Sequence, residues 1–292
     1  MIKQLTIFGV GLIGGSLAMA VRNANACEKV VGCSRNADHL QQAIELDVID
    51  EFTLDPREAV RKADVVLLAV PMGAMEKILK QIADALPTTA IVTDAGSSKA
   101  SVVAAAERVF GSVPDFFVPA HPIAGREKSG VTAATPNLFV DHKVILTPLE
   151  NTCPIAIQRV TRMWQTAGAQ VQTLGVEQHD LVLAATSHLP HVLAYSLVDT
   201  LSETEYVDEI FQFAAGGFRD FSRIASSDPV MWRDICLENK TAILDALRNF
   251  QDNLAELQNF IDRSDGNALL RIFTQAKMIR DENVMKHKTK PE

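Results

Sequence analysis

Short apolar runs alternate with longer helical stretches along residues 1–175 of the chain. The runs are rich in Val and Ile and show little polar alternation, which is typical of strands that are buried on both faces. Because helical stretches separate them, the pattern predicts an α/β fold with a doubly wound parallel sheet. The expected strands are residues 5–8, 30–33, 65–70, 91–94, 116–120, 144–147 and 171–174, and the expected helices include residues 37–46, 74–86, 99–109 and 155–167.

The pattern changes after Gly175, where no further convincing strand follows. Long segments with apolar residues at helical spacing run through residues 178–201, 207–215, 229–260 and 268–285. Apolar side chains recur from Leu237 to Ile261 at the spacing of one helix face, which favours a core or a subunit interface. We therefore expect two domains, residues 1–175 and an all-helical domain over residues 176–292.

A glycine-rich turn follows the first expected strand directly, with the sequence GVGLIGG at residues 9–15. Gly9 permits a tight turn, Gly11 lets the backbone approach a pyrophosphate, and Gly14 lets the following helix pack closely on the strand. The N–H groups at the start of that helix, around Leu12 and Ile13, would face the phosphates. The motif predicts that residues 1–175 form a Rossmann-type dinucleotide-binding domain, although the same turn can serve packing alone.

The end of the second expected strand bears on which dinucleotide binds. In this fold an acidic residue at that position binds the ribose 2′-hydroxyl and selects NAD. Here the position holds Ser34, followed by Arg35. A hydroxyl and a guanidinium accept a 2′-phosphate, so we expect NADP in preference to NAD, unless Arg35 is only a solvated surface charge. Val70 and Pro71, at the end of the third expected strand, are expected to border the cofactor.

Two candidate catalytic residues follow other strand ends, where the ligands of open α/β sheets gather. Ser97 stands at the start of a helix after Asp94, where it suits a contact to cofactor and substrate but equally a helix N-cap. His121 ends an apolar strand just before Pro122, and its ordinary pKa of about 6.5 lets it take up a proton at neutral pH. A purely structural His121 is the alternative.

The helical half supplies candidate substrate ligands. His188 and His191 lie three residues apart on either side of Pro190. We expect no metal site, because Pro190 intervenes and no third ligand is adjacent, and we expect the pair to contact or orient a substrate. Arg219 and Arg223 are four residues apart, so they share a helix face and suit a ligand with two carboxylates, with salt bridges to nearby Asp residues as the alternative.

The overall composition narrows the function classes. The 292 residues carry a formal net charge of −8, which argues against a nucleic-acid partner and means that an anionic substrate needs a local cluster of arginines. The four cysteines show no Cys-x-x-Cys spacing and the first residues read as a strand rather than a secretion signal, so we expect a cytoplasmic protein. No apolar run reaches the ~18 residues of a membrane span, and we expect no membrane association.

Six segments together resemble the prephenate/arogenate (cyclohexadienyl) dehydrogenase family of tyrosine biosynthesis, in that family's order and over nearly the whole chain. They are residues 9–15, 94–99, 121–130, 187–191, 216–225 and 228–232. The resemblance implies an N-terminal Rossmann domain, a C-terminal helical domain for substrate binding and dimerisation, and a homodimer. It implies oxidative decarboxylation of prephenate, a small dicarboxylate, to 4-hydroxyphenylpyruvate, with hydride transfer to NAD(P).

The resemblance also implies catalytic roles for single residues. His121 would accept the proton of the ring hydroxyl, and Ser97 would hydrogen-bond near that hydroxyl and His121. An ionic network that involves Glu127 and Asp220 is implied as well.

Other residues would bind the substrate by the same resemblance. Arg223 would bind the ring carboxylate, His188 and His191 would line the pocket, and Gly216 would approach the ligand from the partner subunit. To these we add Arg219 as the candidate for the side-chain carboxylate.

Three alternatives stay open at this point. Arogenate carries an ammonium group where prephenate has a keto group; we favour prephenate because His191 and Arg219 add positive charge and no obvious carboxylate stands beside them. A β-hydroxyacid-type dehydrogenase shares the layout but needs a catalytic lysine, for which Lys240 is the nearest candidate. A dinucleotide-sensing protein without activity shares the fold, but the combination of His121 with the arginine pair disfavours it.

Overall fold

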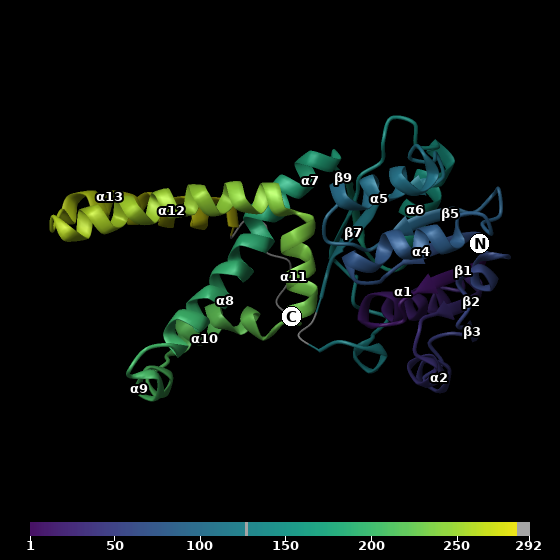
Figure 1. The fold of residues 1–292 in the computed structure, drawn as a ribbon, viewed down its shortest axis with the longest axis horizontal. Coiled ribbons are helices and arrows are strands. Elements are labelled where there is room, and N and C mark those ends of the chain that lie inside the picture. The colour runs from purple at the N-terminus through teal and green to yellow at the C-terminus, as the bar shows by residue number, and fades with distance from the viewer. Residues whose placement is uncertain (126–127, 285–292) are drawn as a thin grey trace. The chain divides into compact units, whose positions relative to one another are not determined.

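The computed structural model describes residues 1–125 and 128–284. Its chain contacts divide the protein into two compact units, Met1–Lys240 and Thr241–Glu292. All strands of the described residues belong to the first unit (Figure 1). The expected domain boundary at residue 175 falls inside this unit, between the last strand and the first helix of the all-helical region, and it stays a prediction.

Six parallel strands form the main sheet, in the order β3–β2–β1–β4–β5–β6. The strands are β1 (Ile2–Phe8), β2 (Cys27–Cys33), β3 (Glu51–Thr53), β4 (Val65–Leu68), β5 (Ile91–Asp94) and β6 (Phe117–Val118). The last residues of four strands are register partners, since Phe8 pairs with Cys33 and Leu68, and Leu68 pairs with Asp94. Their carboxyl ends therefore lie along one edge, where such sheets bind ligands.

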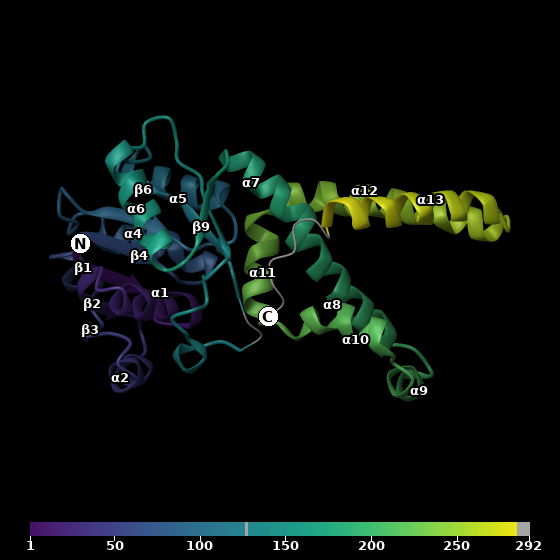
Figure 2. The ribbon, with the colours of Figure 1, turned by 180° about the vertical axis from the view of Figure 1, so that it is seen from behind.

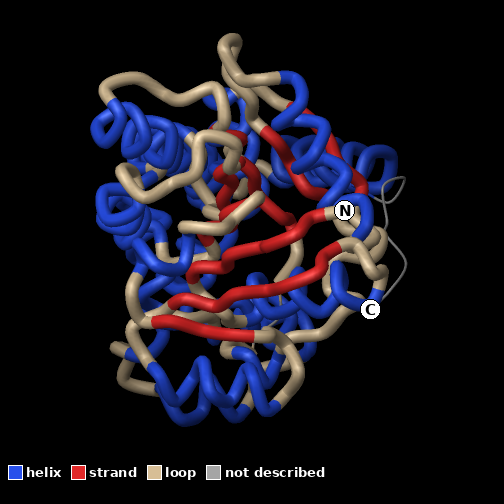
Figure 3. The backbone as a smooth tube through the Cα atoms, turned by 90° about the vertical axis from the view of Figure 1, so that its right-hand side faces the viewer, coloured by secondary structure: helices blue, strands red, loops and turns tan. Residues whose placement is uncertain are grey.

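Helices cover both faces of this sheet, as Figure 3 shows around the strands. They are α1 (Leu12–Asn23), α2 (Ala37–Glu45), α3 (Pro56–Val60), α4 (Met75–Ile82), α5 (Ala100–Phe110) and α6 (Pro154–Thr166). Successive strand residues point to opposite sides: Val65 and Leu67 lie in one core with α1 and α6, whereas Val66 and Leu68 lie in a second core with α3, α4 and α5. The predicted doubly wound parallel sheet is confirmed.

Two details of the strands differ from expectation. The pattern does not predict β3, because its three residues are partly or fully exposed and form no apolar run. Pro119 has no N–H for a ladder, and it separates β6 from β7 (Ala120–Ile123), so the expected strand at residues 116–120 divides. β7 pairs antiparallel with β8 (Lys143–Leu146), which pairs with β9 (Gln170–Thr173) in a second sheet. The expectation that His121 ends a parallel strand is therefore wrong, because it lies inside β7.

Beyond β9 the described part of the first unit is entirely helical, as predicted. Its elements are α7 (Val176–Leu183), the π-helical turn η3 (Ala184–His188), α8 (Leu189–Ser202), α9 (Val207–Gln212), α10 (Gly216–Ser222), the 3-10 turn η4 (Arg223–Ser226) and α11 (Pro229–Glu238). α10 lies beside α8 (Figure 2). The helix expected over residues 229–260 divides at Asn239, the C-cap of α11.

The helical run over residues 176–202 is more apolar than expected. It contains an 18-residue window with a mean hydropathy of 1.4, and 22% of that window is buried. By length and composition alone this run is able to cross a membrane, so the expectation that no apolar stretch is long enough is wrong. The same two properties also describe an apolar helix that packs on protein. Because only 22% of the window is buried, much of its apolar surface is uncovered within one chain.

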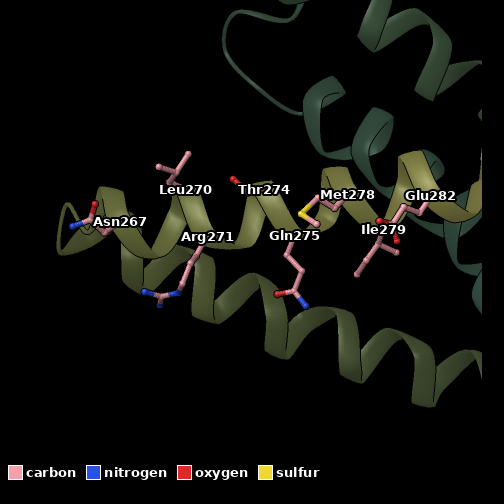
Figure 4. Close-up of a pocket in the computed structure, with 8 residues that line it drawn as sticks. All are labelled: Asn267, Leu270, Arg271, Thr274, Gln275, Met278, Ile279 and Glu282. Atoms are coloured by element: carbon pink, nitrogen blue, oxygen red, sulfur yellow. The ribbon is translucent and has the colours of Figure 1, made fainter.

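The second unit is made of helices α12 (Lys240–Asp262) and α13 (Gly266–Ile279), followed by the π-helical turn η5 (Arg280–Val284). Large apolar side chains are exposed on both helices, among them Leu254, Ile261, Leu270 and Phe273. A groove of about 470 Å³ follows one face of α13 (Figure 4). Its lining residues are Asn267, Leu270, Arg271, Thr274, Gln275, Met278, Ile279 and Glu282. The amphipathic pattern thus leaves an apolar face on this unit that another surface can cover.

Candidate active site

The glycine-rich turn has the geometry that a bound pyrophosphate requires. Gly9 has a φ of 89°, and a Cβ at this position would lie 2.2 Å from the carbonyl oxygen of Ala69. A Cβ on Gly14 would lie 2.3 Å from the Gly9 carbonyl oxygen, so only glycine lets α1 pack this closely. Gly11 is the N-cap of α1, faces open space, and no side chain caps the helix. The open approach to the first N–H groups, those of Leu12 and Ile13 included, fits the phosphates of a dinucleotide.

The other residues expected near the cofactor lie on the same edge of the sheet. Val70 follows β4, and its Cγ1 atom lies 3.1 Å from the position that a Gly9 Cβ would occupy. Pro71 is exposed and is the N-cap of the 3-10 turn η1 (Met72–Ala74). Val70 therefore lies against the glycine-rich turn, whereas the contact of Pro71 with a cofactor stays a prediction.

Ser34 and Arg35 follow β2, whose last residue pairs with the last residue of β1. The Ser34 hydroxyl accepts from the N–H of Asn36 at 3.2 Å and donates to its carbonyl oxygen at 3.1 Å. Asn36 in turn caps α2 by accepting from the N–H of His39. These bonds fix the turn, and the Arg35 side chain is exposed beside it.

A buried ion pair fixes the backbone next to His121. Asp94, at the end of β5, and Lys99 are both fully buried, and the Lys99 ammonium group donates to an Asp94 carboxylate oxygen. Lys99 also donates to the carbonyl oxygen of Ala120 at 2.7 Å, while Asp94 accepts from the Ala120 N–H at 3.0 Å. Burial lowers the pKa of Lys99, and the charge of Asp94 opposes that shift. The pair ties both polar backbone groups of Ala120 to β5 and so positions His121.

His121 begins a chain of hydrogen bonds that leads into α7. Its Nδ1 atom lies 2.9 Å from Nε2 of His179, and Nδ1 of His179 lies 2.7 Å from Oδ1 of Asp180. The two imidazole rings meet edge to face, with centroids 5.1 Å apart. His121 is 9% exposed and His179 is fully buried. Burial, together with the positive charge of Lys99, lowers the pKa of His121 well below its usual value, so its imidazole is neutral at neutral pH.

Asp180 also completes the first turn of α5, although Lys99 lies 81 positions earlier in the sequence. Its Oδ1 atom accepts from the Lys99 N–H at 2.7 Å, and its Oδ2 atom accepts from the Ala100 N–H at 2.9 Å and from the Ser98 hydroxyl at 3.2 Å. α5 has no side-chain cap of its own, so this carboxylate satisfies N–H groups that would otherwise be unpaired. Burial acts to raise the pKa of Asp180, but the hydrogen bonds from His179 and from the two N–H groups lower it overall.

His188 is a buried, neutral imidazole with one unused nitrogen. It ends η3, is 1% exposed, and burial lowers its pKa to about 4. The side-chain nitrogen of Asn239 lies 3.1 Å from Nδ1 of His188 and donates to the Asp180 carbonyl oxygen at 2.9 Å. The Asp180 carbonyl oxygen only accepts, so the NH2 group of Asn239 faces both it and His188. Nδ1 of His188 must then accept from this NH2 group, which places the His188 proton on Nε2. Nε2 has no partner among the described residues, so it is a buried donor available to a ligand.

His191 stacks on Trp232, with ring centroids 3.7 Å apart and an interplanar angle of 19°. Its Nδ1 atom lies 2.9 Å from the Ser187 carbonyl oxygen, so Nδ1 carries the proton. Burial lowers the pKa of His191, the Ser187 carbonyl opposes the shift, and the charge of Arg223 adds to it. Trp232 also meets His188 edge to face at 6.1 Å. One aromatic side chain therefore holds both histidines of the expected pair, and Arg223 acts on the same neighbourhood.

The structure places the remaining candidates without assigning them a ligand. Ser97 is half-buried between β5 and α5, and Gly216 and Arg219 are exposed on α10. Arg223 is the first residue after α10 and begins η4, so it follows Arg219 by about one helical turn. Their contacts to a substrate stay predictions. Glu127 of the expected ionic network lies outside the described residues.

Four residues of this site are not predicted from the sequence: Lys99, His179, Asp180 and Asn239. His179 and Asp180 lie in the segment at residues 178–201, which the apolar pattern identified only as a helix, although two adjacent polar residues there are an available signal. In the sequence, Lys99 is recognised only as the first residue of an expected helix. Asn239 gives no local signal beyond the end of a helix. In the described part of the chain, no group of three or more His, Cys, Asp or Glu side chains has an arrangement suited to a metal ion.

Two family descriptions match nearly the whole chain. The nucleotide-binding domain of prephenate dehydrogenase matches residues 17–173, and the dimerization domain of prephenate dehydrogenase matches residues 175–275. These two matches meet where the strands end and the all-helical region begins.

Individual relatives cover the chain to a similar extent. The cyclohexadienyl dehydrogenase of Zymomonas mobilis is 39% identical over 282 residues, which are 95% of each protein. The prephenate dehydrogenase of Bacillus subtilis is 36% identical over 279 residues, which are 95% of this chain and 75% of that protein. The crystal structure of prephenate dehydrogenase from Aquifex aeolicus in complex with hydroxyphenyl propionate and NAD+ has a TM-score of 0.90 at 38% identity, with 97% of this chain and 98% of that chain covered. The resemblance seen in the sequence is confirmed, and this chain belongs to the prephenate dehydrogenase family.

Proposed function

We propose that this protein catalyses the oxidative decarboxylation of prephenate to 4-hydroxyphenylpyruvate in tyrosine biosynthesis, with hydride transfer to a nicotinamide dinucleotide. The observation that carries the proposal is His121, a buried and neutral imidazole whose neighbour Ala120 is bound through its backbone to Asp94, the last residue of β5, and to Lys99. The names of the similar proteins, prephenate dehydrogenase and cyclohexadienyl dehydrogenase, support the same substrate class.

His121 is the base of the proposed reaction. It takes the proton of the hydroxyl group on the cyclohexadienyl ring, which pushes electron density toward the carbon that loses hydride. The dinucleotide, when bound, accepts that hydride. Loss of carbon dioxide makes the ring aromatic, and the proton held by His121 returns to the same oxygen as the phenol forms. A neutral imidazole suits this role because it begins the reaction unprotonated.

Positively charged side chains of the helical region are proposed to bind the two carboxylates. Arg223 binds the ring carboxylate and Arg219 the side-chain carboxylate, since a guanidinium group pairs with a carboxylate through two parallel hydrogen bonds. The same positive charges favour prephenate over arogenate, whose side chain carries an ammonium group. His191, whose pKa is lowered in part by the charge of Arg223, is proposed to line this part of the site.

Polar groups that carry no charge are proposed to orient the ring. His188 donates from its unused Nε2–H to a substrate oxygen, and Ser97 bonds the ring hydroxyl beside His121. Gly216, at the start of α10, is proposed to approach the ligand from the partner subunit.

The proposed cofactor is NADP in preference to NAD. Gly9, Gly11 and Gly14 form the cradle for the pyrophosphate, and the exposed Arg35 beside Ser34 provides a positive charge for a 2′-phosphate. One similar protein was solved with NAD+, so relatives of this chain include an NAD-binding enzyme. An Arg35→Ala variant should raise the KM for NADP+ by about tenfold and leave the KM for NAD+ unchanged, because only the phosphate is lost as a partner.

We further propose that the protein works as a homodimer in the cytoplasm. The match to a dimerization domain supports the dimer, and the exposed apolar faces of α12, α13 and the run over residues 176–202 are its proposed interface. Four free cysteines agree with a reducing compartment.

Steady-state kinetics with two substrates and two cofactors tests the whole proposal. Prephenate and arogenate are each combined with NAD+ and with NADP+, and the aromatic product is identified. We expect turnover with prephenate, release of carbon dioxide and a higher kcat/KM with NADP+. Turnover of neither cyclohexadienyl acid, with cofactor binding intact, would contradict the assigned reaction.

A further inference from the structure

We propose that His179 and Asp180 are positioning residues that hold His121 in one tautomer, with its proton on Nδ1 and its Nε2 lone pair free. This inference rests on the proposed function for the use of that lone pair. The tautomer itself is a property of the protein alone and is measurable without substrate.

The hydrogen-bond partners of Asp180 determine where the proton of His179 lies. The Lys99 N–H donates to one carboxylate oxygen of Asp180, and the Ala100 N–H donates to the other. A backbone N–H group can only donate a hydrogen bond. Both oxygens are therefore acceptors. The third close partner, Nδ1 of His179 at 2.7 Å, must then be the donor, which places the His179 proton on Nδ1.

The proton position of His179 in turn determines that of His121. A His179 ring that carries one proton, on Nδ1, has only a lone pair on Nε2. That Nε2 lies 2.9 Å from Nδ1 of His121, so Nδ1 of His121 must donate. A neutral imidazole carries one proton, and Nε2 of His121 is left as the base.

The opposite assignment requires one more proton in the chain, either on Nε2 of the fully buried His179, which would make that ring a cation, or on Asp180. A proton on Oδ1 would turn His179 around and place the proton of His121 on Nε2, where the ring cannot act as a base. The three hydrogen bonds from His179, Lys99 and Ala100 favour the carboxylate form and oppose this state. The capping of α5 thus also determines which nitrogen of His121 is free.

The pair acts through His121 and is not itself in contact with the reacting atoms in this proposal. When His121 takes the substrate proton, its ring becomes a cation whose Nδ1–H still points at the His179 lone pair, and the Asp180 carboxylate lies behind it. The hydrogen bond to His179 can therefore remain in place when His121 is charged.

Nitrogen-15 NMR of the histidine side chains tests the tautomer directly. In the substrate-free wild-type protein we expect a protonated Nδ1 and an unprotonated Nε2 for His121. His179→Phe keeps an aromatic ring but removes the acceptor, and we expect protonated Nε2 to appear in His121. With this change kcat should fall by about tenfold or more, and the KM for prephenate should stay within about twofold.

Two further variants separate positioning from packing. In His179→Gln the amide NH2 can face Asp180 and the amide oxygen can face Nδ1 of His121, so the wild-type tautomer and most of kcat should return. His142→Phe is the control for the same exchange at a histidine outside the site, whose Nδ1 bonds the Val140 carbonyl oxygen, and it should change neither readout.

A protonated Nε2 on His121 in the wild-type protein would overturn the inference, even if His179→Phe does not fold. An unchanged His121 spectrum in a folded His179→Phe variant would do the same. The expected tautomer without turnover of prephenate would leave this inference standing and contradict the proposed function, so the two failures are distinguishable.

Discussion

Asn239 donates to Nδ1 of His188 over 3.1 Å, and this bond leaves the buried Nε2 of His188 protonated and unpaired. The same amide holds the Asp180 carbonyl oxygen, so the C-cap residue of α11 connects both histidine systems of the site. The bond to His188 does not tolerate a doubly protonated His188, because Nδ1 would then have to donate toward an NH2 group.

The low pKa of His188 makes the stability of the protein depend on pH. At neutral pH His188 is mainly neutral in the native and in the unfolded state. Below pH 6.5 the His188 of the unfolded chain binds a proton, whereas the native protein binds it only near pH 4. The free energy of unfolding should therefore fall as pH drops, by about 2 kcal/mol between pH 7 and pH 5 for this group. Urea unfolding at both pH values measures the loss.

A His188→Gln variant provides the comparison, because it removes this titration. Its stability should fall less than that of the wild-type protein over the same pH interval. His39→Gln, at an exposed histidine, is the control and should behave like the wild-type protein. Equal losses in the wild-type protein and in His188→Gln would show that His188 is protonated in the native state.

Lys99→Met should be strongly destabilising. The substitution leaves the buried Asp94 carboxylate without its cation, and breaking a buried pair in this way costs about 3–5 kcal/mol. Lys80→Met is the matched control, since Lys80 pairs with Glu76 at the surface and the loss of stability should be small. Denaturant unfolding compares the two, and similar small losses would mean that Asp94 does not depend on Lys99.

Gly11→Ala and Gly14→Ala should fail in different ways. A methyl group at Gly11 meets nothing within 4 Å in the protein, so the fold should be retained while the affinity for the dinucleotide falls. A methyl group at Gly14 lies 2.3 Å from the Gly9 carbonyl oxygen, so this variant should lose stability. Calorimetric titration with the cofactor and thermal unfolding distinguish the two effects. Unchanged cofactor affinity in Gly11→Ala would contradict the assignment of this turn to the dinucleotide site.

His121→Asn should lower kcat by about 10²–10⁴, the range of general base catalysis, while the KM for prephenate changes little. The Asn side chain keeps polarity at the position but cannot accept the proton. Steady-state kinetics at saturating cofactor gives both values. Nearly full turnover in this variant would exclude His121 as the base.

Arg223→Ala should weaken binding of prephenate more than it slows turnover, because the carboxylate contact exists before the transition state. A hydrogen bond to a charged group is worth about 1.5–3 kcal/mol, which corresponds to a rise in KM of about 10-fold to 100-fold. Arg219→Ala on the same helix face serves as the comparison. An unchanged KM in Arg223→Ala would contradict its assignment to the ring carboxylate.

The sequence predicted the parts of this protein that local patterns encode. β1, the turn at Gly9 and the helix after it follow from a period of apolar residues and from glycine spacing, and the family follows from six ordered segments. The division at Pro119 was readable in principle, since proline lacks the N–H that a continuous ladder needs, yet the apolar run extended across it. Local patterns were less informative where residues distant in the sequence meet.

Asp180 illustrates that limit. Nothing in residues 98–100 indicates that a carboxylate from α7 will cap their helix, because a cap is usually supplied by the residue that starts the helix. The same holds for Asn239, which looks like a simple helix end and serves two buried groups. Long-range hydrogen bonds of this kind depend on the folded arrangement and leave no periodic trace in the chain.

The reach of Asp180 across the chain has a consequence for how this protein can be divided. A gene fragment that stops after β9 encodes every strand of the described residues and the glycine-rich turn, but it removes the carboxylate that closes α5 and the imidazole behind His121. Such a fragment would lack part of the scaffold of its own catalytic base, so the nucleotide-binding half is not an interchangeable module. Chimeras between relatives should join after α11 rather than after β9 if the centre is to be inherited whole.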